Sequence, residues 1–135
     1  MIIEIKETKD VKQDDIIAIY KANHWSSAEK PDQLIQALIN SHSFITAWHN
    51  EKLVGLGNAL SDGFLVVYYP HLIIHPDYQG QGIGKRILNK LQEKYGDFHQ
   101  QILVADGKAI DFYERCGFEP AGETKSMWIY KGNDH

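Results

Sequence analysis

The chain has 135 residues, 43% hydrophobic and 24% charged, with a formal net charge of −4. This composition is typical of a folded protein, and we expect one domain spanning 1–135. The acidic balance argues against a nucleic-acid partner, since nucleic-acid-binding proteins usually carry a basic surface. The charged start does not resemble a signal peptide, no run has the roughly 18 apolar residues of a membrane span, and the single cysteine allows no intrachain disulfide. We therefore predict a cytoplasmic protein with no membrane partner.

The first half of the chain predicts one strand, two helices and then a run of strands. The expected elements are a strand over 1–5, helices over 14–23 and 30–41, a hairpin of strands over 43–49 and 52–60, and further strand over 64–69 and 71–75. Asp14 or Asp15 is expected to cap the first helix, and Pro31 fits the first turn of the second. A polar connector over 24–29 carries an isolated tryptophan. Pro70 predicts a bulge or an edge, because proline has no N–H for a strand ladder.

The second half alternates between strand and helix. The expected elements are helices over 83–96 and 108–117, a buried strand over 100–105 and a final strand over 125–131. Gly96 and Gly117 follow the helical patterns where a C-terminal glycine is favoured. The whole pattern predicts a mixed α/β fold, antiparallel in its first half.

Seven histidines raise the question of a metal site. His71 and His75 are the closest pair, but on one extended strand about 13 Å separates them, at roughly 3.3 Å per residue. No Cys/His cluster has zinc spacing. We therefore expect no metal.

The stretch "YQGQGIGKRI" places Gly80, Gly82 and Gly84 at alternate positions before a helix. The spacing matches neither the P-loop nor the dinucleotide fingerprint. Glycines nevertheless permit positive φ and close approach of a ligand, and a helix N-terminus attracts anions. Lys85 adds a cation there. The pattern favours a phosphate site, and a plain surface turn is the alternative.

Two motifs resemble the GNAT superfamily of acetyltransferases. Gln79 to Gly84 reads Q-x-x-G-x-G, which is similar to the pyrophosphate loop of that family, and "AIDFYERCGFEPAG" resembles its later helix-and-strand segment. The resemblance extends from residue 1 to 131. It implies a mostly antiparallel twisted sheet, splayed into a V-shaped cleft and flanked by about four helices.

The resemblance also implies acetyl-CoA as co-substrate. The expected cofactor-binding residues form the loop and the strand before it, with one residue after the next strand. They are Leu72, Ile73, Ile74, Gln79, Gly80, Gln81, Gly82, Ile83, Gly84, Lys85 and Asp106. Asp106 departs from the asparagine common in the family, which puts that one contact in question.

The reaction implied is direct attack of a primary amine on the acetyl thioester in a ternary complex. By resemblance Tyr113 is the acid that protonates the leaving thiolate, and a core tyrosine is the alternative. His71 is the candidate base, with an intrinsic pKa near ~6.5, while Tyr68 and a solvent-facing His71 remain open alternatives. The acceptor-binding residues are expected to be Trp25, Ser61, Asp62 and Tyr68.

Three functions follow from this interpretation. The first is an N-acetyltransferase acting on a small-molecule amine. The second is a non-catalytic acetyl-CoA-binding or regulatory module, because a fold does not fix a function. The third is an acetyltransferase acting on a protein amine. A homodimer is compatible with each, since dimers are common in the family.

Overall fold

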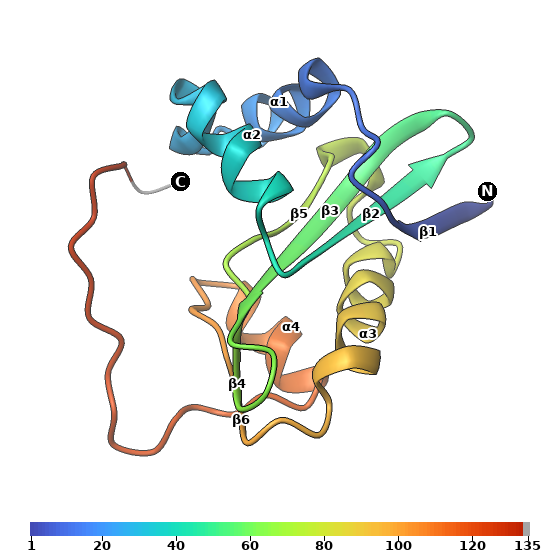
Figure 1. Ribbon diagram of the computed structural model, residues 1–135. Coiled ribbons are helices and arrows are strands. Elements are labelled where there is room, and N and C mark those ends of the chain that lie inside the picture. Colours follow the sequence, from blue (N-terminus) through green and yellow to red (C-terminus); the bar gives the residue numbers. More distant parts are fainter. Residues whose placement is uncertain (134–135) are drawn as a thin grey trace.

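The structure is a computed structural model that describes residues 1–133. Strands and helices alternate irregularly along the chain (Figure 1). In chain order the elements are β1 (Ile3–Glu7), α1 (Gln13–Ala22), the 3₁₀ helix η1 (Ser26–Glu29), α2 (Pro31–Ile39), β2 (Ser43–His49), β3 (Lys52–Ser61), β4 (Val66–Tyr68), β5 (Leu72–Ile74), the 3₁₀ helix η2 (Pro76–Tyr78), α3 (Ile83–Tyr95), β6 (Gln100–Ile102) and α4 (Ala109–Arg115).

The six strands form one sheet in the order β1-β2-β3-β4-β6, with β5 also paired to β3. Every pairing is antiparallel except that of β4 with β6. Gly55–Gly57 of β3 pair with β5, whereas Leu60 and Ser61 pair with β4. The strand ladder is interrupted between β4 and β5 at residues 69–71, where Pro70 lies, as expected.

The arrangement of β4, β5 and β6 opens the sheet. β6 pairs with β4 over Val66–Tyr68, and β5 pairs with β3, so the sheet divides beyond Pro70. This geometry confirms the predicted mixed α/β fold with a mostly antiparallel, splayed sheet.

Helices cover both faces of the sheet (Figure 1). α1 and α2 lie on one face, where their apolar stripes pack against Phe44, Leu53 and Leu56. α3 lies on the opposite face, where Ile87 and other buried residues of its stripe pack against the sheet. β3 supplies side chains to both cores, with Leu53 and Leu56 on the face of α1 and α2 and Val54 on the face of α3. A register shift between β2 and β3 interrupts the strict alternation of side chains at this point.

Two glycines of β3 leave room for neighbouring side chains of α3 and β5. A Cβ on Gly57 would lie 2.8 Å from Cγ2 of Ile87, and a Cβ on Gly55 would lie 2.7 Å from Cδ1 of Ile74. Such separations are shorter than side-chain packing tolerates. Gly57 therefore allows α3 to lie close to the sheet, and Gly55 leaves room for the Ile74 side chain of β5.

Several local predictions were wrong in detail. Lys12, not Asp14 or Asp15, occupies the N-cap of α1, and the two aspartates lie in its first turn, where they still favour the helix dipole. Part of the connector 24–29 forms η1. Phe64 and Leu65 belong to the turn before β4 rather than to a strand.

The predicted final strand over 125–131 was also wrong for this structure. Residues 119–133 have no regular secondary structure and run along one side of the molecule (Figure 1). Within residues 1–133, no helix is long and apolar enough to cross a membrane.

Candidate active site

The glycine-rich loop has the backbone that its sequence predicts. Gly80 and Gly82 have φ values of +78° and +79°, and a Cβ at either position would meet no heavy atom within 4 Å. Left-handed φ favours glycine because other residues clash there. The space in front of both residues is therefore open to a ligand that approaches the backbone.

The N-terminus of α3 follows this loop directly. Gly82 is the N-cap, and the first helical hydrogen bond runs from the N–H of Arg86 to the carbonyl of Gly82. The N–H groups of Ile83, Gly84 and Lys85 precede that bond and lie at the positive end of the helix dipole. The first turn contains no acidic residue, so nothing in it offsets the positive end of the dipole.

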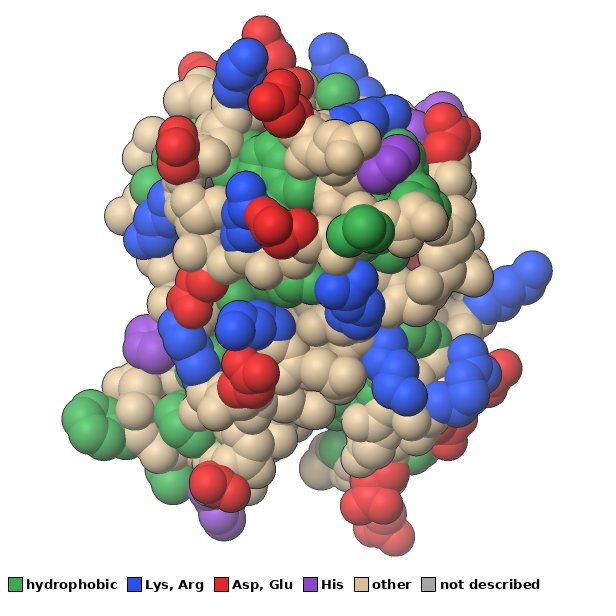
Figure 2. Space-filling model, turned by 90° about the vertical axis from the view of Figure 1, so that its right-hand side faces the viewer, with side chains coloured by type: hydrophobic (Ala, Val, Ile, Leu, Met, Phe, Trp, Pro, Cys, Tyr) green, Lys and Arg blue, Asp and Glu red, His purple; other side chains and the backbone are tan. Residues whose placement is uncertain are grey.

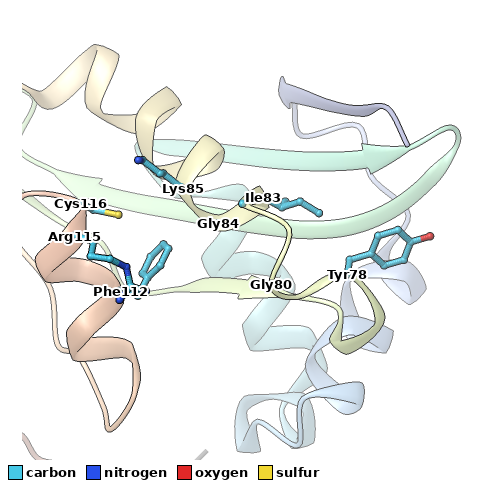
Figure 3. Close-up of a pocket in the computed structure, with 9 residues that line it drawn as sticks. Tyr78, Gly80, Ile83, Gly84, Lys85, Phe112, Arg115 and Cys116 are labelled. Carbon is cyan, nitrogen blue, oxygen red and sulfur yellow. The ribbon is translucent and has the colours of Figure 1, made fainter.

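A cavity of about 340 Å³ opens between the loop and α4 (Figure 3). Phe112 and Arg115 of α4, and Cys116 directly after it, line the cavity opposite the start of α3. The complete lining is Tyr78, Gly80, Gly82, Ile83, Gly84, Lys85, Phe112, Arg115 and Cys116.

Two cationic residues, Lys85 and Arg115, line this cavity. Burial raises the pKa of the Cys116 thiol, and the nearby charges of Lys85 and Arg115 oppose the rise. Elsewhere the charge is mixed, since Lys and Arg are interspersed with Asp and Glu on the face shown in Figure 2. The loop, the helix N-terminus and the cations together fit a pyrophosphate.

The carboxyl end of β5 is held by two amide side chains. Nδ2 of Asn23 and Nε2 of Gln79 each donate to the carbonyl of Ile74 at 3.0 Å. Nε2 of Gln79 also donates to Oδ1 of Asn23. The Ile73 side chain is buried in the core beside α1 and α2, so any cofactor contact of Ile73 would use its backbone.

Three aromatic side chains meet at the break between β4 and β5. The hydroxyl of Tyr20 lies 2.7 Å from Nδ1 of His71. The rings of Trp25 and Tyr20 lie 5.3 and 5.4 Å from the His71 ring, centroid to centroid. The structure therefore brings together the predicted base, His71, and one predicted acceptor residue, Trp25.

The backbone of His71 is fixed as well. Its N–H donates to Oδ1 of Asn58, and its carbonyl accepts from the N–H of Asn58. Asn58 is itself buried on β3 and donates to the hydroxyl of Ser41. Tyr20 is fully buried, and burial raises the pKa of its hydroxyl well above the ordinary tyrosine value. The Tyr20 hydroxyl thus stays protonated and holds the imidazole ring in place.

Tyr113 lies on α4 between two residues that line the cavity. Its ring contacts Phe112 and Phe118 at 5.1 and 5.8 Å between centroids and packs on the main core. Burial, reinforced by the neighbouring Cys116, raises the pKa of Tyr113 to about 12. The hydroxyl is therefore protonated at neutral pH, which both an acid and a core tyrosine require.

The remaining predicted residues are spread more widely. Ser61 and Asp62 hold the turn between β3 and β4: the Ser61 hydroxyl donates to the carbonyl of Val66, and Oδ1 of Asp62 accepts three backbone N–H groups. These hydrogen bonds lower the pKa of Asp62. Tyr68 is exposed on β4. Asp106 is exposed, and its carbonyl accepts the N–H of Ala109 at the start of α4.

Sequence reasoning missed several residues of the site. Arg115, Phe112 and Tyr78 border the cavity, and Tyr20 and Asn23 contact predicted site residues. Their patterns are those of ordinary helical stripes and surfaces, so the sequence alone does not separate them from packing residues. Within residues 1–133, no group of three or more His, Cys, Asp or Glu is arranged to hold a metal ion.

Comparison with known proteins identifies the family. The model of the acetyltransferase (GNAT) domain matches residues 7–128. An uncharacterised N-acetyltransferase, ycf52, of Gracilaria tenuistipitata var. liui is 35% identical over 97 residues, which are 64% of this chain and 53% of that protein. The histone acetyltransferase TAP1 of Glycine max is 33% identical over 82 residues, 58% of this chain and 36% of that protein. The chain thus spans about half or less of these relatives.

A solved structure covers nearly the whole chain. The GNAT family acetyltransferase SP0256 of Streptococcus pneumoniae TIGR4 aligns with a TM-score of 0.84 and 31% identity over 96% of this chain and 99% of that one. Three observations support the same family: the splayed sheet, the glycine loop at the start of α3 and the match over residues 7–128. The chain belongs to the GNAT family of acetyltransferases.

Proposed function

We propose that this chain is an N-acetyltransferase that moves the acetyl group of acetyl-CoA to a primary amine of a small molecule. The observation that carries the proposal is the loop at the N-terminus of α3, where two left-handed glycines open onto a cavity bordered by Lys85 and Arg115. A helix N-terminus flanked by cations is suited to an anion such as a pyrophosphate. The GNAT family supplies the identity of that anion.

The residues present fit coenzyme A. The N–H groups of Ile83, Gly84 and Lys85 would donate to the pyrophosphate, and the open space at Gly80 and Gly82 would admit it. Gln79 contributes indirectly, because its side chain fixes the end of β5. The backbone of Leu72–Ile74 would pair with the pantetheine arm along the edge of β5 that faces away from β3. Acetyl-CoA then supplies the activated acetyl thioester.

His71 is proposed as the base that removes the proton of the attacking amine, directly or through water. It sits where β4 and β5 separate, and Tyr20 and Asn58 fix its ring and its backbone. A fixed imidazole near neutral pH is suited to general base catalysis. Tyr113 is proposed as the acid for the leaving thiolate, since its raised pKa keeps the hydroxyl protonated.

The acceptor is proposed to bind beside Trp25. A second cavity, of about 410 Å³, borders this side chain on the side of η1. Its lining places the Trp25 ring and the Glu29 carboxylate together, a combination suited to a cationic amine, whereas Lys21 in the same lining opposes a cation. Its full lining is Lys21, His24, Trp25, Ser26, Ala28, Glu29 and Asn133.

A protein amine is the second candidate acceptor. The relative from Glycine max carries the name histone acetyltransferase. A module that binds acetyl-CoA without catalysis is the third candidate function.

Two measurements test the proposal. Calorimetry should show that acetyl-CoA binds to the parent and does not bind to Gly82→Glu, because the glutamate places an anion in the glycine-rich loop. Equal affinity in a folded variant would refute the cofactor site. Thiol release from acetyl-CoA across small amines and lysine peptides should be stimulated most by a small cationic amine. Stimulation by peptides alone would favour the second candidate, and binding without stimulated release would favour the third.

A further inference from the structure

The segment that runs from β4 to β5 changes its register against β3. Leu60 lies opposite Tyr68 of β4. Before it on β3, the N–H of Asn58 donates to the carbonyl of His71, the residue that precedes β5. From Asn58 to Leu60 is two residues. From Tyr68 to His71 is three, so the segment opposite β3 carries one extra residue, which bends a strand.

The Asn58 side chain stands between the two backbones at this bend. The residues of a hydrogen-bonded antiparallel pair normally exchange both of their main-chain N–H and carbonyl bonds. Here one bond is of this kind, from the N–H of Asn58 to the carbonyl of His71 at 3.1 Å. The N–H of His71 donates instead to Oδ1 of the Asn58 side chain, at 3.0 Å. The side chain takes the place of the main-chain carbonyl, so the backbone of His71 lies farther from β3 than a regular ladder would hold it.

The amide group of Asn58 is fixed in one orientation. A backbone N–H can only donate, so the atom that faces the N–H of His71 is the oxygen. Nδ2 then donates to the hydroxyl of Ser41 at 3.0 Å, and that hydroxyl donates to the carbonyl of Ala37 in α2 at 2.8 Å. Asn58 and Ser41 are each 4% exposed. A buried network in which these groups are paired is rigid, so it ties the bend to α2.

The bend decides where the proposed base lies. The Tyr20 hydroxyl on α1 holds the ring of His71 through Nδ1, and Asn58 holds the backbone of the same residue. If the backbone of His71 moved towards β3, the imidazole would be displaced relative to Tyr20. A misplacement of about 1 Å in an active site can lower a rate about 100-fold.

We propose that Asn58 is a positioning residue for acetyl transfer and that Ser41 orients it. The Asn58 side chain holds His71 off β3 and thereby keeps the imidazole beside the attacking amine. Both residues are buried, so they act through His71 rather than on the substrates. This role rests on the proposed function, in which His71 removes the proton of the amine.

The test compares Asn58→Leu with Asn58→Asp in the full chain. Leucine keeps the branch at Cγ but has no acceptor for the N–H of His71. Aspartate keeps one oxygen there and offers the other to the Ser41 hydroxyl. Asn58→Leu should lower kcat about 100-fold and leave the Kd for acetyl-CoA unchanged, whereas Asn58→Asp should keep most of the parent kcat.

Three outcomes of this comparison overturn the proposal. The first is a folded Asn58→Leu with the parent kcat. The second is a folded Asn58→Asp that is as slow as Asn58→Leu, because the oxygen facing His71 would then not matter. The third is an equal loss of kcat and of affinity for acetyl-CoA in Asn58→Leu, which would show a general distortion of the cleft.

A matched pair of serines separates positioning from stability. Ser41 and Ser43 are both buried and hydrogen-bonded, but the partner of Ser43 is Tyr95 on α3. Ser41→Ala should lower kcat several-fold, whereas Ser43→Ala should lose comparable stability and keep the parent kcat. Equal kcat values in the two variants overturn the proposal, and this comparison decides the matter where Asn58→Leu does not fold.

A spectroscopic readout is independent of turnover. The nitrogen-15 resonance of Nδ1 in His71 reports the bond to the Tyr20 hydroxyl. It should keep its parent position in Asn58→Asp and shift in Asn58→Leu and Ser41→Ala. A resonance that stays in place in both of these variants overturns the proposal. If the parent transfers no acetyl group, the proposed function fails, and this resonance still decides whether Asn58 sets the position of His71.

Discussion

Gly82→Ala tests the proposed phosphate-binding loop with the smallest possible change of side chain. Gly82 has a φ of +79°, and a Cβ there would meet no heavy atom within 4 Å. The added methyl therefore causes no clash within the protein, and its cost is the left-handed strain of about 1–2 kcal/mol. That strain corresponds to a melting temperature about 2–8 °C lower for a domain of this size.

The effect on acetyl-CoA should be larger than the effect on stability. The methyl would occupy the open space through which a phosphate reaches the N–H groups at the start of α3. Losing about one hydrogen bond to a charged group costs about 1.5–3 kcal/mol. We therefore expect affinity for acetyl-CoA to fall about 10- to 150-fold.

The matched control is Gly63→Ala in the turn between β3 and β4. Gly63 has a φ of +84° and ordinary space for a Cβ, so it carries the same strain away from the loop. Calorimetric titration with acetyl-CoA, alongside thermal melts, separates the two effects. If both variants lose stability equally and keep the parent affinity, the loop holds no phosphate and the reasoning fails.

Three other variants probe the chemistry and the packing. Tyr113→Phe should lower kcat and leave the Kd for acetyl-CoA unchanged. Because burial raises the pKa of Tyr113 to about 12, kcat of the parent should show no loss at pH 10, where an ordinary tyrosine ionises. A parent kcat that halves near pH 10 would contradict this environment of Tyr113. His71→Ala should depress kcat/KM most at low pH, where the amine is protonated, and the loss should shrink as the pH rises. His75→Ala is the control and should keep the pH profile of the parent. Superimposable pH profiles for His71→Ala and the parent would show that His71 is not the base. Gly57→Val should cost about 1–3 kcal/mol of unfolding free energy in urea titrations, because even a Cβ would lie 2.8 Å from Cγ2 of Ile87. A change below about 0.5 kcal/mol would show that α3 shifts to accommodate the side chain.

The local pattern of the sequence was enough for most of the fold. The apolar stripe of Ile83, Ile87, Leu88 and Leu91 predicts α3, and the structure buries all four against the sheet. Pro70 predicts an interrupted ladder, because a missing N–H is a property of the residue itself. The glycines of the loop are predictable in the same way, because glycine readily adopts the left-handed φ that Gly80 and Gly82 have.

The composition of the site depended on tertiary structure. Tyr20 looks like any buried aromatic of a helical stripe, yet its hydroxyl meets His71, which lies 51 residues later. Arg115 joins Lys85 at the cavity only because α4 packs against the start of α3. The side chains of Ser61 and Asp62 hydrogen-bond within the turn in which they lie, and their binding of the acceptor stays a prediction.

The segment 125–131 shows the limit most clearly. Its sequence has the propensity of a strand, and propensity is a local property. Whether a strand forms depends on a partner edge, which is supplied by distant residues or by another chain. The sequence determined the periodicities, the breaks and the glycine loop, because each follows from neighbouring residues; tertiary structure decided which side chains meet and which edges are covered, because those contacts join residues far apart in the chain.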